Sequence, residues 1–186
     1  MKEVEILVEV FSEKKEVLDC LNQYSFIGEN ETLDIYFFDP LKTNLKPVPP
    51  NFPREWFRLR RKADKNYLAY KVDNFDKNGL WLYSDEYETE IGNFETTLKI
   101  IQHLGLRELI TINNLKHAYK TSEYEIVFEE VKNLGQFLEV EKLDILENED
   151  IDDVKEKIQN FINDLNLEVS SELNIGKPEM MLKKLH

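Results

Sequence analysis

Apolar and polar residues alternate at the N-terminus with the two-residue period of a β-strand. One face of residues 1–11 carries the apolar side chains Val4, Ile6, Val8 and Val10. The other face carries three carboxylates and one apolar side chain, namely Glu3, Glu5, Glu9 and Leu7. This strand is therefore expected to bury one side and to present carboxylates on the other.

Similar patterns along the chain predict a protein rich in strands with a few short helices. Further strands are expected at residues 33–39, 56–62, 67–72, 80–91, 109–119 and 123–131. Helical spacing predicts helices from an N-cap at Ser12 to about residue 24, over 94–104 after Asn93, from Asp150 or Asp152 to about residue 165, and over 179–185. Four prolines between residues 47 and 53 predict a connector or a lid.

A second acidic strand is expected at residues 134–141, which read LGQFLEVE. Glu139 and Glu141 are two residues apart, so their side chains point to the same face of this strand. If this face and the acidic N-terminal face line one cavity, up to four carboxylates converge there. Such a group is costly unless a divalent cation such as Mg²⁺ or Mn²⁺ neutralises it.

A basic hairpin contrasts with these acidic strands. Arg58, Arg60 and Lys62 share one face of the strand at 56–62, and Lys71 lies in the next strand. A charged row on a sheet usually faces solvent, and the acidic rows could likewise be a solvated face of a structural domain. Rows of both signs in one small domain instead favour a cavity for a metal-chelated polyphosphate, which needs cationic groups for its oxygens and carboxylates for its metal.

Composition narrows the classes of function. The 186 residues predict one domain over 1–186, with 33% charged residues and a formal net charge of −13. This charge argues against a general nucleic-acid binder. Cys20 is the single cysteine, no apolar stretch approaches 18 residues, and the chain starts with a charged strand. We therefore expect a cytoplasmic protein without a membrane segment.

The order and spacing of these pieces resemble the CYTH superfamily, in particular its class IV adenylyl cyclase-like branch. The resemblance covers nearly the whole chain, to about residue 182. It rests on Glu3 and Glu5, residues 34–40 (DIYFFDP), 57–60 (FRLR), Tyr70-Lys71, Glu88 and Glu90, and residues 134–141. It implies an α+β fold in which a closed antiparallel eight-stranded β-barrel, the triphosphate tunnel, is flanked by helices.

The resemblance also implies a chemistry. Members cyclise ATP or hydrolyse inorganic triphosphate, thiamine triphosphate or related compounds with Mg²⁺ or Mn²⁺. Carried over by position, the metal would be held by Glu3, Glu5, Glu139 and Glu141, with Glu88 and Glu90 as secondary candidates. The phosphates would be bound by Arg58, Arg60, Lys71 and Lys116. A homodimer is also expected from the resemblance, and no catalytic residue is assigned.

Four positions depart from the family pattern. Leu7 occupies the place of the lysine in the N-terminal Glu-x-Glu-x-Lys motif, and Asn114 and Lys116 stand where a Lys-x-Arg pair is usual. Glu86 stands where a basic residue is common. Each lost phosphate contact would reduce transition-state stabilisation by roughly 2–4 kcal/mol. The alternative is therefore a catalytically degenerate tunnel protein that binds a phosphorylated or other anionic ligand without turnover.

Overall fold

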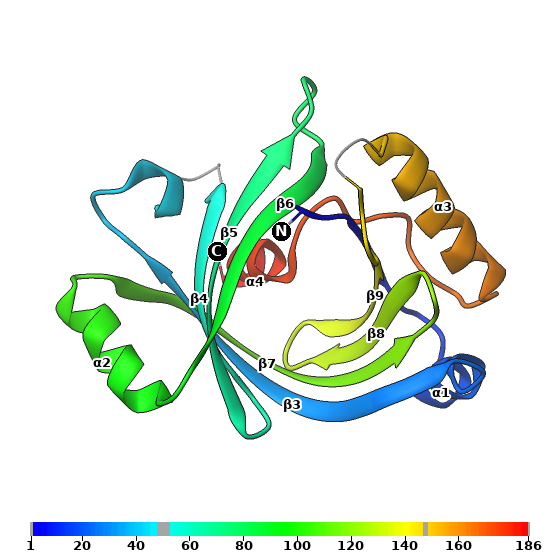
Figure 1. Cartoon of the computed structure of the whole chain (residues 1–186), viewed down its shortest axis with the longest axis horizontal. Helices are drawn as coiled ribbons and strands as arrows, with labels where there is room; N and C mark the ends of the chain where they lie inside the picture. The colour runs from blue at the N-terminus through cyan, green and yellow to red at the C-terminus, as the bar shows by residue number, and fades with distance from the viewer. Residues whose placement is uncertain (1, 48–52, 147–148, 186) are drawn as a thin grey trace.

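One antiparallel β-sheet organises the molecule (Figure 1). The computed structural model describes residues 2–47, 53–146 and 149–185, so most of the proline-rich segment expected at 47–53 lies outside the described residues. Hydrogen bonds join the nine strands in the order β1-β6-β5-β4-β3-β7-β8-β9-β2. Their bounds are β1 Lys2–Glu3, β2 Glu5–Glu9, β3 Ser25–Phe38, β4 Glu55–Lys62, β5 Lys65–Phe75, β6 Trp81–Ile91, β7 Arg107–Lys120, β8 Tyr124–Val131 and β9 Gly135–Lys142.

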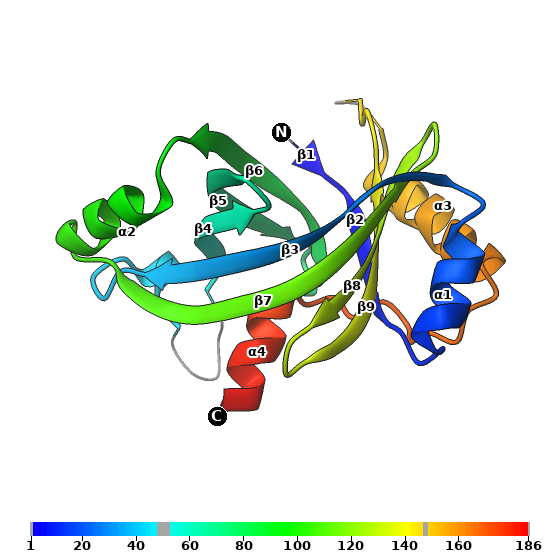
Figure 2. The same cartoon turned by 90° about the horizontal axis from the view of Figure 1, so that it is seen from below.

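The sheet curls strongly but does not close into the expected barrel (Figures 1 and 2). Its two end strands, β1 and β2, are parts of one N-terminal segment that changes partner at Val4. β1 pairs with β6, β2 pairs with β9, and the Val4 carbonyl accepts a hydrogen bond of 3.1 Å from the Lys142 amide. Counted as one segment, β1 and β2 give the predicted eight strands. The edges of the curled sheet meet at Val4 without a continuous ladder between them.

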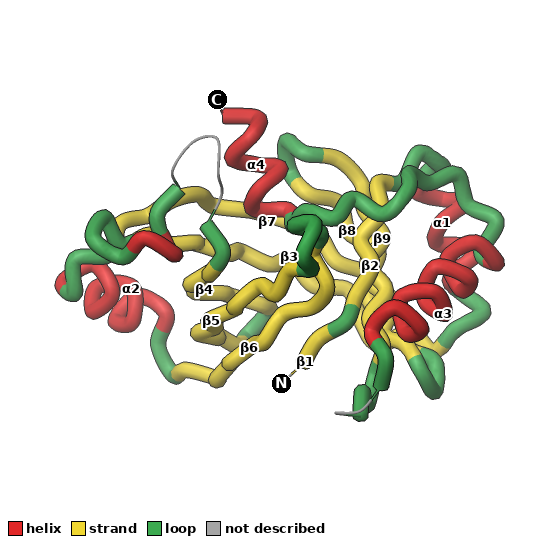
Figure 3. The backbone as a smooth tube through the Cα atoms, turned by 90° about the horizontal axis from the view of Figure 1, so that it is seen from above, coloured by secondary structure: helices red, strands yellow, loops and turns green. Residues whose placement is uncertain are grey.

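Four helices pack on the sheet, and a short 3₁₀ turn at Thr43–Leu45 precedes β4. α1 (Lys14–Leu21) and α3 (Ile151–Asp164) lie together beside β2 and β9, and α2 (Phe94–His103) lies at the opposite end of the molecule (Figure 3). α4 (Lys177–Leu185) packs against the concave side of the curl (Figure 1). No helix within the described ranges is long and apolar enough to cross a membrane.

The alternation of the N-terminal segment decides which face of the sheet is core. Val4, Ile6 and Val8 are almost fully buried and pack in one cluster with Ile158 and Ile162 of α3. Burial of such aliphatic side chains stabilises the fold by about 1.5–3 kcal/mol each. Because neighbouring strand residues face opposite sides, this packing turns Glu3, Glu5 and Leu7 towards the concave side.

Two predicted details of the element ends were wrong, and one was confirmed. Ser12 does not cap α1, because its hydroxyl accepts a hydrogen bond from the Glu168 amide and Glu13 is the N-cap residue. β3 begins at Ser25 instead of residue 33, since its polar first half pairs with β7. Asn93 caps α2 as predicted and accepts a hydrogen bond from the Thr96 amide.

Candidate active site

The concave side of the sheet encloses a cavity of about 240 Å³, which we call the central cavity. Strands from both halves of the sheet and the start of α4 line it. Its wall is dense in charged groups of both signs, as the acidic and basic rows predicted. These groups are Glu3, Glu5, Asp34, Arg58, Arg60, Lys62, Lys71, Asp73, Glu86, Glu88, Lys116, Glu125, Glu139, Glu141, Lys177 and Glu179.

Arg60 is held by a bidentate ion pair with Asp34 of the neighbouring strand β3. Its Nε and Nη2 atoms each lie 2.7 Å from a carboxylate oxygen of Asp34. Burial alone would raise the pKa of Asp34, but the Arg60 guanidinium and the nearby Arg58 hold that pKa well below its usual range. The pair therefore stays charged, and it fixes the Arg60 fork in the cavity wall.

Arg58 lies between two carboxylates of β6. Its Nη2 atom is 2.9 Å from Glu86 and 3.2 Å from Glu88, while its buried Nε has no hydrogen-bond partner among the described residues. Burial would raise the pKa of Glu86, but Lys71 and Arg58 lower it to about 2. Glu86 is thus paired with Arg58 and Lys71 of the cavity wall. These ion pairs explain how a carboxylate is tolerated at this position.

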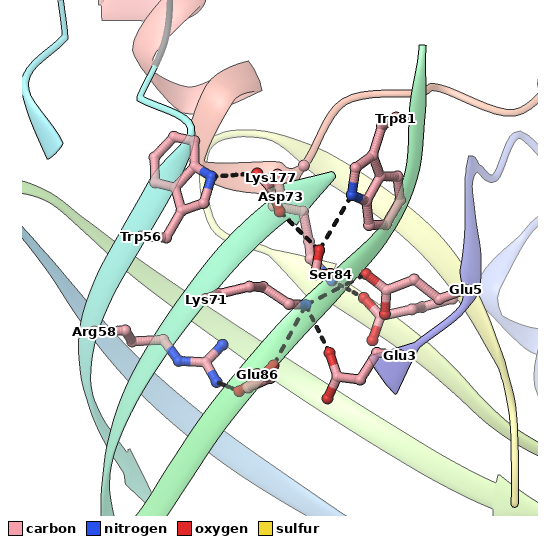
Figure 4. A network of polar contacts seen from close by, with 12 residues as sticks. Glu3, Glu5, Trp56, Arg58, Lys71, Asp73, Trp81, Ser84, Glu86 and Lys177 are labelled. Atoms are coloured by element: carbon pink, nitrogen blue, oxygen red, sulfur yellow. Dashed lines mark hydrogen bonds and ion pairs between the residues drawn. The ribbon is translucent and has the colours of Figure 1, made fainter. Parts of the chain in front are cut away.

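Lys71 extends from β5 towards the N-terminal segment (Figure 4). Its Nζ atom lies 2.9 Å from Glu3, 3.4 Å from Glu86 and 3.7 Å from Glu5. Burial raises the pKa of Glu3 to about 7 despite Lys71, and it also raises the pKa of Glu5. One lysine therefore offsets only part of the negative charge of this group.

Three carboxylates lie directly opposite one another across β2, β9 and β8. Strand pairing sets Glu141 directly opposite Glu5 on one side and opposite Glu125 on the other. Burial and the neighbouring carboxylates, first Glu3 and then Glu5, raise the pKa of Glu141 to about 8. Like charges at directly opposed positions destabilise a sheet.

The donor chemistry of this row fits a hard divalent cation, which oxygen ligands bind and which would neutralise the row. Within residues 2–47, 53–146 and 149–185, no three His, Cys, Asp or Glu side chains are already arranged around one point. Glu3 and Glu5 are instead paired with Lys71, and Glu139 with Lys177. A cation would therefore need these side chains to turn from their lysine partners.

Sequence reasoning missed Lys177 and Glu129. Lys177 is the first residue of α4, and its Nζ forms ion pairs with Glu129 and Glu139. Burial would lower the pKa of Lys177, but the carboxylates of Glu129, Glu139 and Glu5 raise it well above its usual range. Glu125 and Glu129 lie on the same face of β8, and this spacing could have indicated that Glu129 points to the site. Nothing local in the sequence places α4 against the cavity.

Asn114 is part of the support for Glu129. Its side-chain amide donates to Glu129 at 2.7 Å and accepts from the Thr32 hydroxyl at 2.6 Å. Lys116, from the same strand β7, lies 3.6 Å from Glu129. Burial lowers the pKa of Lys116. Asn114 therefore positions a buried carboxylate in this chain.

The predicted metal and phosphate-binding residues all line the central cavity. Of the secondary candidates, Glu88 lines it as well, whereas Glu90 lies outside its wall and pairs with Lys65 at 2.9 Å. Glu90 shares a face with Glu88 but lies one repeat further along β6, beyond the cavity.

An aromatic region adjoins the charged groups (Figure 4). The indole N–H of Trp56 donates to Asp73 at 2.7 Å, and that of Trp81 donates to the Ser84 hydroxyl at 3.1 Å. Ser84 in turn donates to Asp73 at 2.7 Å. These bonds fix both indoles beside the basic and acidic groups. The wall of the cavity therefore has an apolar part as well as a charged part.

Comparison with known proteins decides the family. Residues 1–174 match the family model of the CYTH domain. The chain belongs to the CYTH family. This membership confirms the resemblance drawn from the sequence, and the curled antiparallel sheet around a charged cavity is consistent with the triphosphate tunnel fold.

Relatives of this CYTH chain extend over almost its full length. It is 28% identical over 185 residues to "Putative adenylate cyclase MJ0240" of Methanocaldococcus jannaschii, covering 98% of this chain and 95% of that protein. The structure of PH1819 from Pyrococcus horikoshii OT3 aligns with a TM-score of 0.77 and 22% identity over 97% of this chain and 99% of that one. HpAC1 from Hippeastrum, for which a dominant triphosphatase activity is described, aligns with a TM-score of 0.66 and 15% identity over 98% and 96% of the chains.

Proposed function

We propose that this CYTH protein is a metal-dependent enzyme that acts on a triphosphate compound, as a class IV adenylyl cyclase-like enzyme or as a triphosphatase. The observation that carries the proposal is the presence, in one cavity, of Arg58, Arg60 and Lys71 beside the carboxylate row at Glu5 and Glu141. A metal-chelated polyphosphate needs both kinds of group. The names of the relatives support the same substrate class. Because α4 contributes to the cavity, we propose that residues 1–186 act as one domain.

The basic residues would bind and orient the phosphate chain. Arg58 has a buried Nε donor without a partner among the described residues, which is a group that a phosphate oxygen can satisfy. Arg60 offers a fork that Asp34 already orients, and Lys71 and Lys116 add point charges. Together they would stabilise the charge that grows on the phosphoryl group as its bond to the leaving oxygen breaks. The nucleophile would be water in a hydrolase or a ribose hydroxyl in a cyclase.

Mg²⁺ or Mn²⁺ would be held by Glu3, Glu5, Glu139 and Glu141. Such an ion supplies charge neutralisation for the phosphate oxygens when bound. The pKa values of Glu3 and Glu141 are raised to about 7 and about 8, first by burial and then by neighbouring carboxylates, and a bound cation would offset both costs. We extend the substrate proposal to inorganic triphosphate, ATP and thiamine triphosphate; for the last two, Trp56 and Trp81 offer apolar surface to the organic group.

Leu7 and Asn114 favour a second candidate function. Neither side chain carries the positive charge usual at its position in the family, and Arg58, Arg60 and Lys71 are all engaged by carboxylates of the protein. A cavity of this kind could bind a phosphorylated or other anionic ligand without turning it over. Release of orthophosphate or pyrophosphate separates this candidate from the enzyme.

Arg58→Met should reduce kcat/KM for triphosphate by about 10²–10³-fold, the scale of losing one oriented donor in an active site. Arg61→Met is the matched control, because Arg61 lies on the same strand but pairs with Glu95 outside the cavity and is 45% exposed. Its activity should stay within about twofold of wild type. The measurement is steady-state phosphate and pyrophosphate release with Mg²⁺. Equal activity of Arg58→Met and wild type would exclude Arg58 from substrate binding.

A further inference from the structure

Position 7 is the point at which this chain departs most clearly from a phosphate-binding motif. Leu7 lines the central cavity but cannot bind an anion. Its side chain is buried in one cluster with Met181 and Leu182 of α4. The apolar residue at position 7 is therefore a contact that docks α4 on the concave side.

The docked helix brings a cation to the same place. Strand pairing sets Leu7 directly opposite Glu139, and Lys177 at the start of α4 forms an ion pair with Glu139. Glu129, which is fully buried, also forms an ion pair with Lys177. Opposed residues in an antiparallel pair have Cβ atoms about 4.5–5.5 Å apart, so a cation that contacts Glu139 occupies the region that a side chain at position 7 would reach.

We propose that Lys177 replaces the missing motif lysine as a phosphate-binding group. The apolar packing of Leu7 against α4 holds this lysine at the cavity. This inference rests on the proposed triphosphate function and adds a residue beyond the family match, which ends at residue 174. Lys177 lines the cavity together with Lys116. Glu129 positions its ammonium, in the way that a buried acceptor fixes a charged donor. The cation at this site thus comes from the C-terminal helix instead of the first strand.

Relocating the charge tests the inference. The variants are Lys177→Met, Leu7→Lys, the double variant Leu7→Lys/Lys177→Met, and the control Lys184→Met, whose lysine lies on the same helix and donates to the Asn133 carbonyl. The affinity for inorganic triphosphate with Mg²⁺ is measured by titration calorimetry. Lys177→Met should weaken binding by about tenfold or more, as expected for a lost charge-assisted contact. The double variant should return to within about threefold of wild type, and Lys184→Met should bind as wild type does.

A second readout needs no substrate. Lys177→Met leaves Glu129 and Glu139 with less compensation, so it should lower the thermal midpoint by about 5–10 °C. Lysine at position 7 faces Glu139 but loses the apolar contact with Met181 and Leu182, so the double variant is not expected to regain this stability. If Lys177→Met binds triphosphate as wild type does, or the double variant binds no better than Lys177→Met, the inference is wrong while the proposed function stands. If wild type binds no triphosphate, the proposed function fails, and an unchanged thermal midpoint in Lys177→Met would show that Lys177 does not compensate Glu129 and Glu139.

Discussion

Replacing Glu141 with glutamine should lower metal-dependent turnover by about 10²-fold or more and also stabilise the metal-free protein at alkaline pH. The loss of activity follows because the variant removes one proposed cation ligand. The gain in stability follows because Glu141 lies opposite Glu5 and Glu125, where its charge is unfavourable in the absence of a cation. Opposite effects on activity and stability would distinguish a metal-binding carboxylate from one that holds the fold together.

The pH dependence has a definite sign. Burial and neighbouring carboxylates raise the pKa of Glu141 in the folded protein from 4.5 to about 8. Below pH 4.5 the group is protonated in both states, and its contribution to the free energy of unfolding does not change. Between pH 4.5 and 8 the unfolded chain releases this proton more readily, so stability falls as the pH rises, and the full loss is reached above pH 8.

Urea unfolding of the metal-free proteins at pH 5 and pH 9 measures this effect. Glu141→Gln should be about 1–3 kcal/mol more stable than wild type at pH 9, a figure reduced from the full shift because the group is partly solvated. Glu90→Gln is the control, since Glu90 is outside the cavity and pairs with Lys65. It should change neither turnover nor the pH dependence. A destabilised Glu141→Gln protein with normal turnover would contradict the proposed role.

Arg60→Met should lower the free energy of unfolding by about 3–5 kcal/mol and abolish turnover. Asp34 is 2% exposed and is paired through both of its oxygens with Arg60, so the single variant leaves a buried carboxylate without its partner. The double variant Asp34→Asn/Arg60→Met removes the unpaired charge. It should recover most of the stability but none of the activity.

Urea unfolding and phosphate release, measured on the same preparations, separate the two roles of Arg60. Recovery of stability without activity means that the guanidinium acts on the substrate as well as on Asp34. If the double variant regains turnover along with stability, Arg60 is only a structural residue.

Local alternation allowed much of the site to be predicted. In the N-terminal segment, β4 and β9, the two-residue period fixed which side chains share a face, and burial of Val4, Ile6 and Val8 then turned the carboxylates towards the cavity. The sequence therefore predicted that acidic and basic side chains share the inward faces of these strands. The partner change at Val4, which keeps the sheet from closing as a continuous ladder, was not readable, because it depends on pairing with both β6 and β9.

Long-range packing explains what the sequence did not reveal. Lys177 enters the site because Leu7, Met181 and Leu182 pack together across the chain, and no local pattern encodes that contact. Ser12 resembled an N-cap, but Glu168, far along the chain, donates to its hydroxyl instead. The role of Asn114 likewise depends on Glu129 and Thr32 from neighbouring strands.

The central claim is that the cavity lined by Arg58, Lys71 and Glu141 binds a triphosphate, and ³¹P NMR with Mg²⁺ tests it most directly. The protein is mixed with inorganic triphosphate and, separately, with ATP at mildly alkaline pH. If the protein is a hydrolase, we expect the triphosphate resonances to be replaced by those of orthophosphate. If it is a cyclase, we expect ATP to give pyrophosphate together with cyclic AMP. Resonances that shift or broaden without new products would support the non-catalytic alternative. Spectra of both compounds that are unchanged by the protein would contradict a triphosphate site.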